Sequence, residues 1–322
     1  MTITLNPENT QFEAMPDESI LEAALRAGIN VRYQCSNGSC GQCRARVLSG
    51  QVQSLYCTDF PLSVADKQTN VCLMCATAAN ADVTLQVDGA HAASDVPTQV
   101  IDAKLSRMEE LDNGVFVAHV RTPRSSTLWF LAGQQVRISW GGSSFNTAIA
   151  SCPCNGMQLQ FHLHVGVSES VDDFIANAKK GMTVVINGPF GECTLNEKQQ
   201  APIILISNDT GFATSKSIIE HAIALDWPHA VRLYRQFQTL PGHYMHNYCR
   251  SWAEALDDYA HMDFTDATVK QIMQQLQKEP QLIISANFYV AGGRQWFDAT
   301  RTVLIGLGIE GSRIYSSVDD NT

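Results

Sequence analysis

The sequence has few basic residues, and this shortage excludes one class of partner. Its 22 Lys and Arg stand against 32 Asp and Glu among 322 residues, which gives a formal net charge of -10. Proteins that bind nucleic acid neutralise phosphates with a basic surface, and this chain cannot supply one. We therefore expect no nucleic-acid partner. The acidic surface is interpreted as favouring solubility or the docking of a basic protein.

Targeting and membrane signals are also missing. The N-terminal stretch MTITLNPENTQFEAM has no basic segment followed by an apolar one. No apolar run approaches the ~20 residues that a membrane helix needs. Without a secretory signal, the 10 cysteines are expected to be metal ligands or reduced thiols rather than a disulfide framework. These absences predict a cytoplasmic protein with no membrane span.

The length and the order of predicted elements indicate several domains, in a multidomain chain of α+β and α/β class. Residues 1–88 combine strands, one helix and most of the cysteines. Residues 89–99 are small and polar and are predicted to be a linker. Short strands separated by turns over 100–197 are typical of a small antiparallel β-barrel. Strands alternate with helices over 198–322, which predicts an α/β domain with a largely parallel sheet.

One helix in the first segment has identifiable ends. The stretch ESILEAALRA places Ile20, Leu21 and Leu25 on one face. Asp17 is the expected N-cap of this helix, and Gly28 is the residue expected to end it.

The stretch CSNGSCGQC carries the chemistry of the first segment. Cys35, Cys40 and Cys43 have the spacing C-x4-C-x2-C, which is that of plant-type [2Fe–2S] proteins. A loop of this kind lets three thiolates converge while its backbone N–H groups point at the sulfur atoms. Gly38 and Gly41 permit the close backbone approach that a Cβ would obstruct. The sequence therefore predicts one [2Fe–2S] cluster.

The fourth ligand must come from Cys57, Cys72 or Cys75. Cys75, in VCLMCATA just before the strand ADVTLQV, has the expected context, and Cys72 is its competitor. A zinc site fits less well, because structural zinc sites usually pair cysteines as C-x2-4-C twice. A Rieske centre would need two histidine ligands near the cysteines, and none is placed for that role.

These motifs carry a family resemblance. Residues 1–88 resemble a plant-type ferredoxin, here a β-grasp domain, and the whole order resembles the single-chain reductases of phenol hydroxylase and methane monooxygenase. The likeness extends to the CDP-6-deoxy-glucoseen reductase branch. It implies a flavin-reductase-type barrel and a nucleotide-binding-type α/β domain. It also implies that NADH or NADPH gives a hydride to FAD, which passes single electrons to the cluster. The implied partner is an electron-acceptor protein such as an oxygenase component.

The flavin motif of the family is altered in this chain. The family carries R-x-Y-S on a barrel strand, and the corresponding stretch here is FNTA. Phe145 replaces the Arg, Thr147 the Tyr and Ala148 the Ser. A register shifted by one residue offers Ser144, Asn146 and Thr147 instead. Neither register supplies a cation for the flavin diphosphate. Thr147 remains the candidate flavin contact on this strand.

The second flavin element of the family is a basic residue followed by G-x-x-S at the start of a helix. Here Gly166 stands where a basic residue is usual, and SESVDDF has no glycine. Asp172 and Asp173 would repel a phosphate at that helix N-terminus. Their simpler interpretation is that they complement the helix dipole.

The nucleotide motif is partly retained. The family carries G-G-T-G-x-A-P, where a helix N-terminus holds the pyrophosphate. In SNDTGFAT, Thr210, Gly211 and Ala213 match this motif, whereas Asp209 adds negative charge. Gly292, in VAGG, matches the glycine of a late C-G motif whose cysteine is replaced by alanine. Arg232 and Arg235, in the second α/β strand, weakly allow NADPH, but arginines at such positions are commonly just solvated, and the sequence does not choose between NADH and NADPH.

Two hypotheses follow from these substitutions. In the first, the chain is an NAD(P)H reductase that passes electrons through flavin and cluster to a partner metalloenzyme. In the second, it is a flavin-free iron–sulfur carrier whose reductase-like domains serve as a docking scaffold. Cys152 and Cys154, in SCPC, are interpreted either as a redox pair or, more simply, as two small thiols.

Overall fold

The structure is a computed structural model of residues 1–322. It describes all residues except 8, 30, 34, 35, 40, 61, 63, 88–92, 94, 95, 112, 113, 124, 125, 198, 239–243, 266–268 and 320–322. Contacts divide the chain into two compact units. One comprises residues 1–90, 122–129 and 154–157, and the other comprises the remainder. Most of the predicted linker at 89–99 lies outside the described residues.

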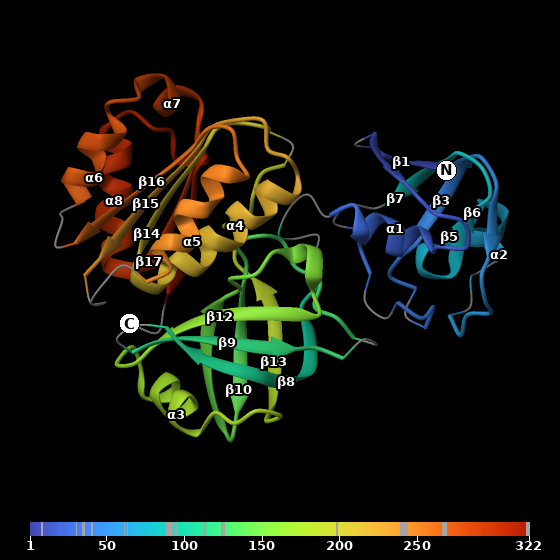
Figure 1. Ribbon diagram of the computed structural model, residues 1–322, viewed down its shortest axis with the longest axis horizontal. Coiled ribbons are helices and arrows are strands. Elements are labelled where there is room, and N and C mark those ends of the chain that lie inside the picture. The colour runs from blue at the N-terminus through green and yellow to red at the C-terminus, as the bar shows by residue number, and fades with distance from the viewer. Residues whose placement is uncertain are drawn as a thin grey trace. The chain divides into compact units, whose positions relative to one another are not determined.

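The first unit contains a five-stranded sheet of order β2-β1-β7-β3-β5. Its strands are β1 (Thr2–Asn6), β2 (Thr10–Glu13), β3 (Arg44–Ser49), β5 (Val71–Leu73) and β7 (Val83–Val87). A second, two-stranded sheet pairs β4 (Val52–Ser54) with β6 (Thr77–Ala79). The helical elements are α1 (Ile20–Arg26), α2 (Val64–Gln68) and the 3-10 turn η1 (Met74–Ala76). Strands β1 and β7 run parallel and the other pairs antiparallel, which is the mixed sheet of a β-grasp domain (Figure 1).

Helix α1 supplies part of the core of this unit. Ile20 and Leu21 are buried with Ile3 and Leu5 of β1. The helix begins at a capping box, in which the Ser19 hydroxyl accepts from the Glu22 backbone N–H and the Glu22 side chain accepts from the Ser19 N–H. The prediction of Asp17 as N-cap was therefore wrong. Asp17 has a left-handed φ of 60°, whereas Ser19 has the extended conformation that an N-cap requires. Gly28, with φ 75°, follows the helix as predicted.

The second unit begins with a six-stranded antiparallel sheet of order β11-β10-β13-β8-β9-β12. Its strands are β8 (Gln99–Glu110), β9 (Val115–Arg121), β10 (Gln135–Trp140), β11 (Ser143–Ala148), β12 (Gln158–His164) and β13 (Thr183–Phe190). The sheet curls into a half-barrel, and α3 (Glu169–Asn177) follows β12 (Figure 1). The predicted antiparallel barrel fold is confirmed.

The rest of the second unit is a parallel sheet of order β16-β15-β14-β17-β18. Its strands are β14 (Ile203–Asn208), β15 (Val231–Phe237), β16 (Tyr259–Thr265), β17 (Asn287–Gly293) and β18 (Ile314–Asp319). The helices are α4 (Phe212–Ala224), α5 (His246–Ser251), α6 (Val269–Leu276), α7 (Pro280–Ser285) and α8 (Arg294–Gly306). The predicted parallel α/β fold is confirmed.

Both faces of this sheet are covered, as Figure 1 shows. On β14, Leu205 belongs to the same buried cluster as Ile218 of α4, whereas Ile206 belongs to the cluster of Leu304 in α8. Successive strand residues thus point into opposite cores, which explains the uninterrupted apolar run of PIILIS. Among the described residues, no helix is long and apolar enough to cross a membrane.

Candidate iron–sulfur and nucleotide sites

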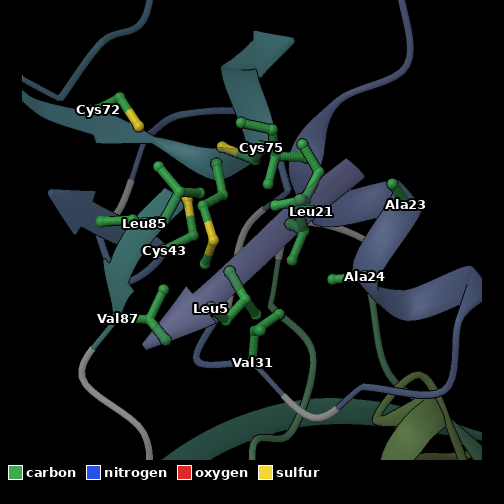
Figure 2. Close-up of a cluster of buried hydrophobic side chains, with 14 of the residues drawn as sticks. Leu5, Leu21, Ala23, Ala24, Val31, Cys43, Cys72, Cys75, Leu85 and Val87 are labelled. Carbon is green, nitrogen blue, oxygen red and sulfur yellow. The ribbon is translucent and has the colours of Figure 1, made fainter. Parts of the chain in front are cut away.

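Two of the predicted cluster ligands lie together in the first unit. Cys43 directly precedes β3 and is 2% exposed, and Cys75 lies in η1 and is 3% exposed. The backbone N–H of Met74 donates to the Cys43 carbonyl at 2.9 Å, which ties the two segments to each other. Figure 2 shows both side chains in the buried cluster with Leu5 and Leu85. Cys35 and Cys40 lie outside the described residues.

The other two candidates for the fourth ligand differ in their surroundings. Cys72, on β5, is 9% exposed and belongs to the same buried cluster as Cys43 and Cys75. Cys57 is exposed. Burial therefore argues against Cys57, while Cys72 and Cys75 must be distinguished by experiment.

The segment 56–60 braces the cysteine loop, and sequence reasoning missed this role. The Tyr56 hydroxyl lies 2.9 Å from the carbonyl oxygen of Cys75 and 3.4 Å from that of Ser36. The Phe60 N–H donates to the Gly38 carbonyl at 3.0 Å. One short segment thus contacts both the loop and the region of the fourth ligand. These contacts join residues about 20 positions apart in the chain, and a local spacing motif cannot report them.

Two features of the structure favour glycine at position 41. Its φ is 71°, in the left-handed region, and a Cβ at this position would lie 2.5 Å from ring atoms of Phe60. Gly38, with φ 78°, would collide in the same way with the Thr58 side chain. The absence of a Cβ at both glycines is therefore what lets the cysteine loop lie close to the segment 56–60.

We expect Gly41→Ala to lower the cluster content and the thermal stability of the first unit. A left-handed non-glycine residue costs on the order of 1–3 kcal/mol, and the collision with Phe60 adds to this. Iron and sulfide per chain, together with a thermal melt, measure the effect. The control is the double variant Gly41→Ala with Phe60→Ala, which removes the ring that the new Cβ would meet. No recovery of cluster content relative to Phe60→Ala alone would attribute the loss to the left-handed backbone and not to the contact with Phe60.

A cleft lies at the carboxyl end of the parallel sheet, where α/β folds bind nucleotides. It has a volume of about 630 Å³, and its walls include Asn208, Asp209, Thr210, Gly293 and Arg294. Asn208 ends β14, and Asp209 and Thr210 follow it. Gly293 ends β17, and Arg294 begins α8. The Asp209 carboxylate accepts from the backbone N–H of Gln238 at 2.9 Å. That carboxylate is therefore held in the cleft, where a phosphate would meet its negative charge.

The predicted cofactor contacts meet at a second, much smaller cavity. Its volume is about 30 Å³, and its lining includes Thr147, Thr210, Gly211, Ala213 and Gly292. Strand β11 and the turn before α4 thus come together as the family resemblance implies. A cavity of this size is large enough for a water molecule.

Both glycines at this cavity are required by packing. A Cβ on Gly211 would lie 2.6 Å from the carbonyl carbon of Ala291. A Cβ on Gly292 would lie 2.9 Å from atoms of Asn208 and Trp296. The match to the nucleotide motif at these positions is therefore explained by the close approach of β17 to the turn after β14.

His162 is a buried histidine beside this cavity. Its Nδ1 lies 3.3 Å from the Tyr244 hydroxyl, and among the described residues its Nε2 has no hydrogen-bond partner. Burial, followed by the positive charge of Lys216, lowers the pKa of His162 well below its ordinary value. The ring is therefore neutral at pH 7, and the unpartnered nitrogen suits a small polar molecule in the cavity.

The residues at the flavin position do not fit a flavin diphosphate. Phe145 is 5% exposed, and its ring meets that of Phe174 edge to face at 5.3 Å. At the start of α3, Ser168 accepts from the Val171 N–H, and the Asp172 carboxylate accepts from the Gly166 N–H at 2.7 Å. The strand therefore presents an aromatic ring to the apolar interior. The helix N-terminus is occupied by groups of the chain itself, one of them negatively charged.

Neither arginine considered for NADPH recognition is free to bind a phosphate. Arg232 pairs with Asp258 and Glu279, each at 2.8 Å. Arg235 is 1% exposed and forms a salt bridge with Asp263, in which Nη2 lies 2.6 Å from Oδ2. Both guanidinium groups are therefore already paired with carboxylates of the chain.

Known proteins are similar to this chain both in its first segment and over most of its length. Residues 3–80 match the family of 2Fe-2S iron-sulfur cluster binding domains. The CDP-6-deoxy-L-threo-D-glycero-4-hexulose-3-dehydrase reductase of Yersinia pestis is 28% identical over 235 residues, which cover 73% of this chain and 70% of the relative. The reductase component of propane 2-monooxygenase from a Gordonia species is 24% identical over 264 residues, covering 80% and 76%.

Solved structures share the fold over nearly the whole chain. An Amycolatopsis cytochrome P450 reductase superposes with a TM-score of 0.62 at 19% identity, covering 98% of both chains. Phthalate dioxygenase reductase superposes with a TM-score of 0.56 at 15% identity, covering 68% of each. The chain thus has a ferredoxin-reductase-like fold, and its residues 3–80 match 2Fe-2S iron-sulfur cluster binding domains. It is similar to the dehydrase reductase of Yersinia pestis and to reductase components of oxygenase systems.

Proposed function

We propose that this chain is an electron-transfer reductase component that delivers electrons through a [2Fe–2S] cluster to a partner metalloenzyme such as an oxygenase component. The observation that carries the proposal is that Cys43 and Cys75 are both buried and lie on hydrogen-bonded segments within a stretch that matches 2Fe-2S domains. Such a cluster accepts and donates single electrons. The names of the relatives, among them terephthalate 1,2-dioxygenase and phenol 2-monooxygenase reductase components, support an oxygenase as the partner class.

The proposal assigns four thiolates to the cluster: Cys35, Cys40, Cys43 and Cys75. It also divides the chain into a ferredoxin domain at 1–88, a linker at 89–99, a flavin-reductase-type barrel at 100–197 and an NAD(P)-binding-type domain at 198–322. Support comes from the C-x4-C-x2-C spacing and from the separate sheets of the fold. A cytoplasmic location belongs to the same proposal.

The source of the electrons separates the two candidate functions. Phthalate dioxygenase reductase transfers electrons from pyridine nucleotides to a 2Fe-2S cluster, and FAD would supply the change from two-electron to one-electron chemistry. The second candidate, a flavin-free carrier with a docking scaffold, is favoured by Phe145 and by the occupied N-terminus of α3. Under this candidate, a separate reductase feeds the cluster.

Flavin content decides between the two candidates. The full chain is purified, denatured and assayed for released flavin by fluorescence, and the native cluster is exposed anaerobically to NADH and to NADPH. The proposed reductase is expected to release stoichiometric flavin and to show rapid bleaching of the cluster, whereas the flavin-free carrier is expected to contain iron and sulfide without flavin. Stoichiometric flavin with fast bleaching would overturn the flavin-free candidate. Absence of iron and sulfide would overturn both.

A further inference from the structure

We infer that His246, His261 and Asp263 form a binding site for a divalent transition-metal ion, and that Zn²⁺ is the ion their chemistry favours. All three side chains belong to the second unit, where they lie on β16 and at the start of α5. Each offers one ligand atom, and these atoms all lie within 4.8 Å of one another. Imidazole nitrogen and carboxylate oxygen are common zinc ligands. This inference does not depend on the source of the cluster's electrons.

Strand β16 places two of the ligands next to each other. His261 and Asp263 are two positions apart on this strand, and alternate residues of a strand point to the same face of the sheet. Both are partly buried, whereas Ala260 and Met262, which alternate with them, are exposed. Strand β16 is also an edge strand of the parallel sheet. The two ligands therefore share one face at an edge that an ion from solvent can reach.

The start of α5 brings the third ligand to this pair. His246 Nδ1 lies 2.9 Å from Asp263 Oδ2, and the rings of His246 and His261 meet edge to face with their centroids 5.2 Å apart. Zinc bonds place tetrahedral nitrogen and oxygen ligands about 3.3–3.6 Å from one another. The His246 side chain is 48% exposed, so a small rotation of this ring can close the remaining separation.

The two ligands on β16 are oriented by partners of their own. Arg235, opposite Asp263 on β15, donates from Nε to Oδ1 at 2.8 Å and from Nη2 to Oδ2 at 2.6 Å. The Tyr259 ring stacks on His261 with an interplanar angle of 23°. Metal ligands in proteins are commonly held by such outer contacts. The guanidinium also repels a further cation, so we expect weaker binding than at a structural zinc site.

Metal binding would replace a proton between His246 and Asp263. The carboxylate can only accept, so Nδ1 of His246 carries the proton of their hydrogen bond. When Zn²⁺ takes the Nδ1 lone pair, this proton passes through water to Nε2, and the ring stays neutral. No electron is transferred, and the ion is held by two neutral imidazoles and one carboxylate.

Calorimetric titration of the full chain with Zn²⁺ tests the site. Cys57→Ala serves as the parent, because the exposed Cys57 thiol can itself take the ion. We expect one site that weakens at least about tenfold in His246→Gln and in His261→Gln, since losing even an outer partner of a ligand costs about 10–100-fold in affinity. A glutamine at 246 can still donate to Asp263, so this variant separates ligation from hydrogen bonding. Mg²⁺ should not bind, because it prefers oxygen ligands.

The matched control is His229→Gln, which should bind Zn²⁺ as the parent does. His229 lies between α4 and β15, and it belongs to no comparable group of metal-binding side chains in the part of the chain that the structure describes. No zinc uptake by the parent would overturn the inference. The same holds for unchanged affinity in both His246→Gln and His261→Gln.

Chemical modification tests the site without any substitution. The full chain is treated with diethyl pyrocarbonate with and without Zn²⁺, and its peptides are analysed by mass spectrometry. We expect the ion to protect His246 and His261, while His229 reacts equally in both samples and serves as the internal reference. Equal modification of His246 and His261 in the two samples would overturn the inference.

Discussion

Replacing Cys75 with alanine is expected to remove most of the visible absorption of the [2Fe–2S] cluster, whereas Cys72→Ala leaves it in place. The two residues lie three positions apart and are 3% and 9% exposed, so they are closely matched in burial. A cluster that loses one of four thiolates is not retained, because the iron left short of a ligand exchanges with solvent. Iron, sulfide and absorbance per chain after anaerobic purification measure the difference.

The surroundings of the two cysteines give the reason for this choice. The carbonyl of Cys75 meets the Tyr56 hydroxyl that also approaches Ser36 of the cysteine loop. Cys72 instead lies within β5, opposite Ala45 of β3, and its thiol hydrogen-bonds to Thr77. The pairing of β5 with β3 fixes the direction of the Cys72 side chain. Loss of the cluster in Cys72→Ala with retention in Cys75→Ala would reverse the assignment. Cys57→Ala should match the parent.

The local patterns of the sequence predicted those features that depend on neighbours in the chain. The cysteine spacing, the buried strand PIILIS and the helix ATSKSIIEHAIAL all follow from short-range rules. The strands β16 and β18 were missed, because both lie at edges of the parallel sheet. The stretch YAHMDFT of β16 has no fully buried apolar residue, and an edge strand with polar residues lacks the apolar run that marks a central one.

The functional contacts that the sequence could not predict are those between distant segments. His246 meets His261 and Asp263 only because the start of α5 lies beside β16. The motif match at Gly211 and Gly292 was visible, but its reason was not. Gly211 allows the turn after β14 to approach the backbone of Ala291, and Gly292 leaves room for the side chains of Asn208 and Trp296. Both reasons would hold whether or not a nucleotide binds. Motif residues therefore line one cavity, and the motif does not identify what the cavity holds.

Arg235→Met is expected to lower the free energy of unfolding of the second unit by about 3–5 kcal/mol, because it leaves a buried carboxylate without its cation. Arg235 is 1% exposed and Asp263 is 5% exposed, and both guanidinium contacts to the carboxylate are short, at 2.6 and 2.8 Å. The matched control is Arg232→Met on the same strand. Its partners Glu279 and Asp258 are 38% and 60% exposed, so its loss should cost at most about 1 kcal/mol. Urea denaturation followed by circular dichroism measures both.

The pH dependence of the stability difference between the parent and Arg235→Met tests whether this difference is electrostatic. Burial alone would raise the pKa of Asp263, but the hydrogen bonds and charge of Arg235 outweigh it, with a smaller contribution from His246, and the net pKa lies below the ordinary value. The stabilisation is therefore fully present above the unfolded-state pKa of about 4 and is lost as the pH falls through the folded-state value. The gap between parent and Arg235→Met should narrow below about pH 4. A gap that is the same at pH 3 and pH 7 would attribute the loss to packing. The double variant Arg235→Met with Asp263→Leu should recover part of the stability, because it removes the unpaired charge itself.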